Sequence, residues 1–94
     1  MKHIHNIAGA LTFATVATVW QQSQAWLAHS ASPLQFDLQN VDQSDSAGVA
    51  LLIAWVRAAR QQHKEIHFLH LPAQMRAIIA VSGLENILPI TEEQ

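Results

Sequence analysis

Asn40–Val49 reads Asn-Val-Asp-Gln-Ser-Asp-Ser-Ala-Gly-Val and separates two segments of different periodicity. Before it, apolar and polar residues alternate from Leu34, which predicts a strand with one apolar face. After it, a long apolar run extends to Arg60 and has the character of a helix. The ten residues therefore predict a tight polar turn that leads from a strand into the N-terminus of a helix.

Two residues of this turn, Asp45 and Ser46, are suited to begin a helix. Their side-chain oxygens can accept hydrogen bonds from the first unpaired N–H groups. A helix start also carries partial positive charge and free donors, which favour an anion or a phosphate. Ser46 is therefore a candidate partner contact or phospho-acceptor, although the local chemistry is equally explained by a capped turn and nothing more.

The remainder of the chain alternates between strand-like and helix-like segments. This order predicts a layered α/β domain with parallel pairing, and because three strands make a thin sheet we expect a fourth. We assign the whole chain, residues 1–94, to one domain with a core over about 4–90 and a polar tail over 91–94. The first predicted segments are a strand His3–Ala8, broken by Gly9-Ala10, and a helix from near Ala14 to Ala28 with Thr12 as its N-cap. The residues of this helix region expected to face the core are Phe13, Val16, Trp20 and Leu27. The later predicted segments are a helix Ser46–Gln62, a strand Glu65–Leu71, a helix from Pro72 capped by Gly83, and an extended or irregular segment Leu84–Ile90.

The predicted helix after the polar turn carries two apolar stripes on roughly opposite faces. One of them must face the sheet, and we expect Leu51 and Ala58 of the other to pack against a neighbouring helix. Trp55 is the stronger interface candidate, because aromatic residues are enriched at protein interfaces. The first stripe is Val49, Leu52, Ile53 and Val56, and the second is Leu51, Trp55 and Ala58.

Composition argues against several classes of function. Half of the 94 residues are hydrophobic, 13% are charged and the net charge is −2, without the basic stripe that a nucleic-acid-binding protein needs. No cysteine is present for a disulfide, a thiol nucleophile or a thiolate metal site. The six histidines lack metal-ligand spacing, and Asp37, Asp42 and Asp45 have no accompanying base or nucleophile. We therefore expect no metal, no cofactor and no catalysis.

The N-terminal segment raises a question of location. A basic start followed by the apolar run Ile7–Trp20 loosely resembles a secretory signal. Gly9 and three threonines interrupt that run, and removing it would delete a strand and most of a helix. The chain also lacks about 20 consecutive apolar residues, the length of a transmembrane helix. We expect a cytoplasmic protein without direct membrane insertion.

The run Asp45-Ser46-Ala47-Gly48, followed by an apolar helix and preceded by Phe36-Asp37-Leu38, resembles the STAS domain family. In that family a strand ending in Asp-Leu leads to an Asp-Ser-x-Gly or Asp-Thr-x-Gly turn. The closing half, Leu71-Pro72 and Ser82-Gly83-Leu84 with Ile87–Ile90, is also similar. The resemblance implies a STAS-type α/β domain with a mixed, mostly parallel sheet of about four strands and three helices. The family's first strand is shortened or absent here, and Ala10 stands where an acidic residue is common.

Two functional groups within the family compete. The short length and the run Ala50–Trp55 look more like the small cytoplasmic STAS subunit (MlaB-like) of the Mla phospholipid ABC transporter, which maintains outer-membrane lipid asymmetry. The resemblance then implies a non-catalytic subunit, peripheral to the inner membrane, that binds and regulates the ATPase subunit. The alternative is an anti-sigma factor antagonist whose serine, here Ser46, is phosphorylated by an anti-sigma serine kinase. In either case the expected partner-binding residues are Ser44, Asp45, Ser46, Ala47, Gly48, Val49 and Trp55.

Overall fold

Strands and helices alternate along residues 4–91, the part of the chain that the computed structural model describes. This order confirms the predicted α/β class with three helices and a parallel sheet. The strands are β1 (Ile4–Leu11), β2 (Leu34–Ser44), β3 (Ile66–Leu69) and β4 (Ile90–Thr91), and the helices are α1 (Val16–His29), α2 (Ser46–Gln61) and α3 (Ala73–Val81).

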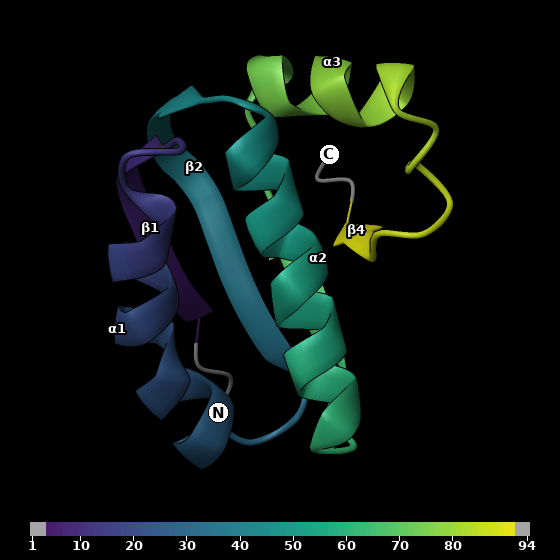
Figure 1. Cartoon of the computed structure of the whole chain (residues 1–94). Helices are drawn as coiled ribbons and strands as arrows, with labels where there is room; N and C mark the ends of the chain where they lie inside the picture. The colour runs from purple at the N-terminus through teal and green to yellow at the C-terminus, as the bar shows by residue number, and fades with distance from the viewer. Residues whose placement is uncertain (1–3, 92–94) are drawn as a thin grey trace.

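The sheet has the strand order β1-β2-β3-β4, and each neighbouring pair is parallel. The described strands thus include no antiparallel member, although a mixed sheet was expected. Figure 1 shows α1 and α2 side by side across one face of the sheet, with their N-terminal ends at the same edge. The expected fourth strand is β4, so Thr91 belongs to the sheet and not to a polar tail. Residues 92–94 lie outside the described residues.

Strand β1 is longer than its sequence suggests. The predicted break at Gly9-Ala10 is wrong, because the strand continues to Leu11. Gly9 has φ +83°, and the pairing with β2 shifts register on either side of the Ala8–Gly9 pair. A glycine in this conformation lets a strand absorb an irregularity without ending. The extension pairs Leu11 with Ser44, so β1 and β2 end next to each other. His3, the first residue of the predicted strand, is outside the described residues.

Helix α1 begins later than expected, at Val16. Thr15 and not Thr12 occupies the N-cap position, and its hydroxyl donates to the Ala10 carbonyl at 2.7 Å. The same hydroxyl oxygen accepts a bond from the Thr12 N–H at 2.9 Å. Phe13 therefore lies in the turn before the helix, where its side chain is 86% exposed. Its predicted core position is wrong, whereas Leu27 is buried as expected.

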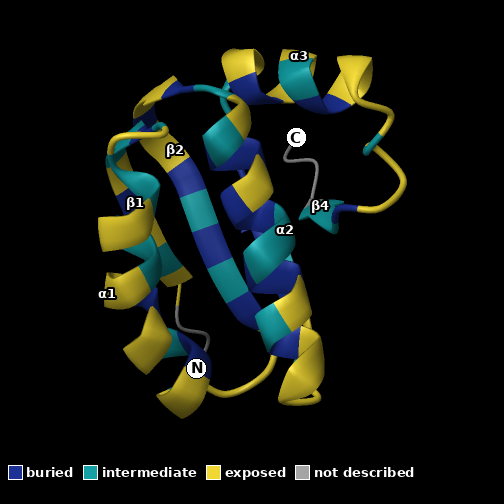
Figure 2. Cartoon of the chain, in the orientation of Figure 1, coloured by how far each residue is buried: buried dark blue, intermediate teal, exposed yellow. Residues whose placement is uncertain are grey.

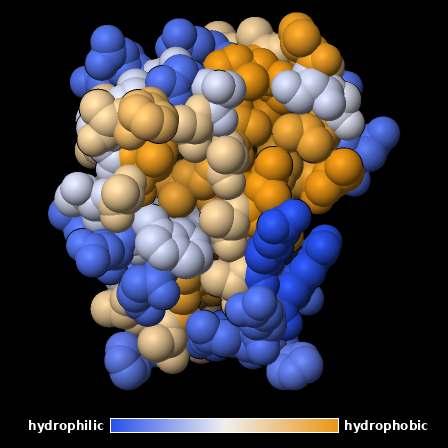
Figure 3. All heavy atoms as spheres, in the orientation of Figure 1, coloured by the Kyte–Doolittle hydropathy of each residue, from blue (hydrophilic) through white to orange (hydrophobic). Residues whose placement is uncertain are grey.

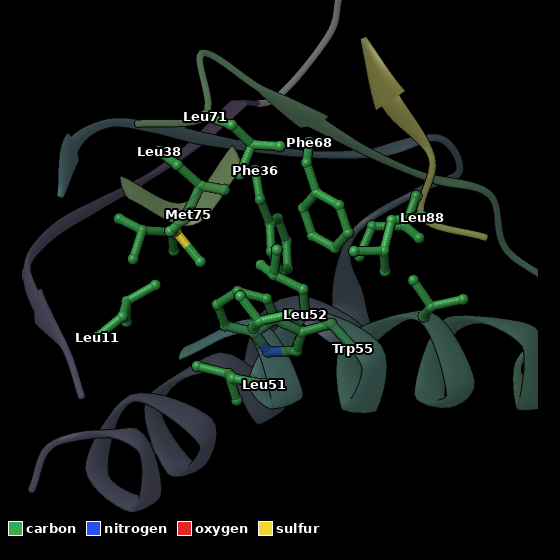
Figure 4. Close-up of a cluster of buried hydrophobic side chains, with 14 of the residues drawn as sticks. Leu11, Phe36, Leu38, Leu51, Leu52, Trp55, Phe68, Leu71, Met75 and Leu88 are labelled. Carbon is green, nitrogen blue, oxygen red and sulfur yellow. The ribbon is translucent and has the colours of Figure 1, made fainter. Parts of the chain in front are cut away.

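The core lies between the sheet and the helices. Figure 2 shows buried and half-buried residues alternating along β2, which confirms the period-two pattern that begins at Leu34. In Figure 4, Phe36 and Phe68 extend from the sheet toward Leu52 and Trp55 of α2. The rings of Phe36 and Trp55 meet edge to face, with centroids 4.7 Å apart. Such a pair contributes about 0.5–1.5 kcal/mol beyond its buried area.

Helix α3 lies at the same end of the sheet as the N-terminus of α2 (Figure 1), and its Gln74 side chain accepts a hydrogen bond from the Ser44 N–H at the end of β2. Pro72 takes the N-cap position, one residue before the helix, where its missing N–H costs no hydrogen bond. Met75 and Ile79 are buried against the core. Gly83 follows the helix with φ +71°, the left-handed conformation expected of a helix-terminating glycine.

Candidate functional site

The turn between β2 and α2 is organised by the carboxylate of Asp45. This residue is the N-cap of α2, and its Oδ1 accepts hydrogen bonds from the N–H groups of Ala47 at 2.9 Å and Gly48 at 3.4 Å. Its Oδ2 accepts a third bond, from the N–H of Phe13 at 3.1 Å. Since Phe13 belongs to the loop after β1, one side chain joins the two loops at this edge of the sheet. The predicted capping role of the turn is present in the structure.

Gly48 explains the glycine of the Asp-Ser-x-Gly pattern. It lies in the first turn of α2 and is buried against the end of β1. A Cβ atom at this position would overlap the carbonyl oxygen of Leu11 and crowd the Leu11 Cβ, at 3.1 Å. That carbonyl also accepts a bond from the Asp45 N–H at 3.3 Å. Only glycine lets the helix start approach the strand this closely.

Ser46 is the exposed member of the turn. It is the first residue of α2, and within residues 4–91 its hydroxyl has no hydrogen-bond partner. Ala47, the next residue, is half-buried. The Asp45 carboxylate is bonded to backbone N–H groups, and Gly48 is packed against the end of β1. Ser46 is therefore the residue of the Asp-Ser-x-Gly run whose side chain is available to a partner or to modification.

Four of the predicted partner-binding residues are buried and do not form a surface. Gly48 and Val49 face the core side of α2. Ser44 lies at the end of β2, where its N–H donates to the Gln74 side chain of α3 at 3.3 Å and its hydroxyl is buried without a hydrogen-bond partner. Their contacts hold the turn against the sheet and α3.

Trp55, the fourth, is 0% exposed, so its prediction as an interface residue is wrong. The physical reason is that its one polar group is satisfied inside the protein. Its indole N–H donates to the hydroxyl of Ser23 on α1 at 2.8 Å, and that hydroxyl in turn donates to the Trp20 carbonyl at 2.7 Å. Spacing along α2 alone did not reveal this partner on another helix.

The exposed surface beside Ser46 is apolar and comes from both helices. We call it the α1–α2 groove: a shallow depression of about 320 Å³ that begins at the N-terminal ends of α1 and α2. Phe13 stands exposed at the same end. Figure 3 shows the most hydrophobic surface of this view at the upper right, paler surface toward the left where α1 lies, and hydrophilic residues along the lower edge and at the upper left. The groove is lined by Val16, Ala17, Trp20, Ala47, Ala50, Leu51 and Ala54.

Sequence reasoning found the α2 side of this surface only in part and missed the α1 side. Phe13 and Trp20 were assigned to the core, because their spacing fits a buried helix face. The available signal was the small side chains at Ala47, Ala50 and Ala54, spaced by three and four residues on one helix face. Alanines there leave room between two helices that larger residues would fill.

Other chemistry is not assembled around the turn. Asp37 is engaged with residues outside the turn, because its Oδ1 accepts a hydrogen bond from the Gln39 N–H at 2.9 Å and lies 3.1 Å from Nδ1 of His70. In the described part of the chain, no three potential metal ligands come together. None of the helices within residues 4–91 combines the length and hydrophobicity needed to cross a bilayer.

Comparison with known proteins agrees with this architecture. The model of the family described as "Mlab, STAS domain" matches residues 5–89. Among solved structures, an anti-sigma factor antagonist candidate from Thermotoga maritima superposes with a TM-score of 0.77 at 11% identity, over 96% of this chain and 78% of that one. The anti-sigma factor antagonist SpoIIAA in its unphosphorylated form gives a TM-score of 0.67 at 15% identity, over 97% and 79% of the two chains. A search of curated proteins gives no significant match.

Proposed function

Because the chain belongs to the MlaB-type STAS domain family, we propose that it is a non-catalytic accessory subunit that binds the cytoplasmic ATPase of a phospholipid ABC transporter. STAS domains are protein-interaction modules, and the proposal names the partner and the surface. The observation that carries it is the exposed apolar surface of the α1–α2 groove, together with exposed Phe13, whose N–H bonds to Asp45, the residue before exposed Ser46.

Binding would act through burial of this surface. An aromatic side chain moved from water into an interface contributes roughly 1.5–3 kcal/mol, and Phe13 starts 86% exposed. The energy gained would favour the assembled form of the ATPase and so set the activity of the transporter. In this role the protein would be cytoplasmic and held near the inner membrane by its complex.

The test is co-purification of the tagged chain with the ATPase of a phospholipid ABC transporter from the same genome. Ser46→Glu places an unpaired charge at the contact and should abolish recovery of the ATPase, because burying that charge is unfavourable. Ser82→Glu is the matched control, since it places the same charge on an exposed serine at the end of α3. Recovery of the ATPase with Ser46→Glu as well as with wild type would show that the surface is wrong.

A second function, an anti-sigma factor antagonist switched by phosphorylation, is favoured by the likeness to antagonist structures and by the free hydroxyl of Ser46. A phosphate at this helix start would add charge that a partner must desolvate. Intact-mass measurement of the chain purified from its native host separates the two readings. A phosphoserine at Ser46, together with recovery of a serine kinase in place of an ATPase, would establish the switch.

A further inference from the structure

The α1–α2 groove adjoins a second depression on the same face of α2. The second depression continues along α2 toward its C-terminus and shares Trp20, Ala50 and Ala54 with the first. It adds polar residues, among them Arg57 and Gln61. The two depressions form one channel that changes from apolar to polar along the helix.

Arg57 is the one charged side chain among the described residues that line the two depressions. Neither α1 nor α2 contains an aspartate or a glutamate. Asp45, at the start of α2, already accepts three backbone hydrogen bonds. Arg57 is exposed and has no ion-pair partner within residues 4–91.

An apolar surface with an unpaired arginine at one end is suited to bind a segment that carries both an apolar side chain and a carboxylate. Ala50 and Arg57 are seven residues apart on α2, a rise of about 10 Å, or about two helical turns. A helix lying in the channel would present side chains at the same intervals. An apolar side chain would fill the small-residue end, and a carboxylate two turns away would reach the guanidinium.

Resting on the proposed function, we infer that the ATPase contributes an amphipathic helix with an apolar anchor over Ala47 and Ala50 and an acidic residue paired with Arg57. The anchor supplies affinity, and the ion pair fixes the orientation of the helix in the channel and its register. A helix with a basic residue at the second position would be rejected by like charge.

The inference is tested by titrating the isolated ATPase with the full chain at low and high salt. Arg57→Glu should weaken binding roughly tenfold at low salt and remove most of the salt dependence, because the attractive pair becomes repulsive. Arg60→Glu is the control: it makes the same change on the same helix, but Arg60 lines a different depression with Lys64 and Glu65. Binding that Arg57→Glu and Arg60→Glu weaken equally, or that neither weakens, would overturn the inference while leaving the proposed function intact.

A charge exchange completes the experiment. Individual Asp→Arg and Glu→Arg variants of the ATPase are combined with Arg57→Glu, and one of them should restore binding to within about threefold of wild type. If no exchange restores it, the ion pair does not exist. If the wild-type chain does not bind the ATPase at all, the proposed function fails and this inference fails with it.

Discussion

The indole N–H of Trp55 on α2 donates a 2.8 Å hydrogen bond to the hydroxyl of Ser23 on α1, and both side chains are completely buried. This contact fixes the spacing of the two helices that form the groove. It also turns a residue that resembles an interface aromatic into the centre of the core, where Trp55 packs edge to face on Phe36.

Removing the hydroxyl should therefore destabilise the fold. In Ser23→Ala the indole N–H is left buried without a partner, and we expect the free energy of unfolding to fall by about 1–3 kcal/mol. Chemical denaturation followed by tryptophan fluorescence measures it. In a Trp55→Phe background the same serine substitution should cost much less. Equal costs in both backgrounds would mean that the hydrogen bond contributes nothing.

The cap at Asp45 gives a second prediction. Asp45→Ala removes the acceptor of three N–H groups, those of Ala47, Gly48 and Phe13, and should lower stability by about 1–2 kcal/mol. Asp45→Asn keeps a side-chain oxygen and should cost less. Thermal unfolding compares the variants, with Ser46→Ala as a neighbour that should change little because its hydroxyl is exposed. A neutral Asp45→Ala would contradict the capping role.

Gly48 should reverse the usual effect of alanine in a helix. In an unconstrained helix interior, alanine is about 1 kcal/mol more favourable than glycine. Here the added Cβ overlaps the Leu11 carbonyl oxygen, so Gly48→Ala should destabilise the protein by more than about 1 kcal/mol and shift α2 away from β1. Ala77→Gly, at an exposed position in α3, tests the ordinary propensity and should cost about 1 kcal/mol. If Gly48→Ala stabilised the protein, the end of β1 at Leu11 must move to accommodate the added Cβ atom at little cost.

Phe13 should matter for association and not for folding. Its side chain is 86% exposed, so Phe13→Ala should change stability by less than about 0.5 kcal/mol. If it is an anchor of the interface, affinity for the ATPase should fall by roughly 10-fold or more. Val81→Ala is the control, because Val81 is 90% exposed at the far end of α3. Equal losses of affinity in the two variants would remove Phe13 from the interface.

The elements that local chemistry determines could be read from the sequence. Alternation from Leu34 predicted β2, and Asp45 at the N-cap predicted the start of α2, because both depend on neighbours within a few residues. The end of β1 and the place of Phe13 could not be predicted in this way. Both depend on contacts with a distant segment, namely the pairing of Leu11 with Ser44 and the bond from the Phe13 N–H to Asp45.

Within the candidate site, the position of Ser46 could be predicted from the sequence, whereas the residues of the groove beside it could not. Ser46 is exposed as its position at a helix start suggests. Trp55 was misjudged because the group that satisfies its indole N–H inside the core, the hydroxyl of Ser23, lies 32 residues away in the sequence. The α1 wall of the groove required the packing of two helices, which one-dimensional periodicity does not contain.

The bond between the Asp45 carboxylate and the Phe13 N–H has a consequence for the thermodynamics of association. It ties the loop before α1 to the start of α2, so Phe13 and Ser46 are carried by one preorganised unit and not by two loops that must be ordered separately. A protein that contacts both residues meets a surface already in its bound geometry, and the entropy lost on docking is correspondingly small.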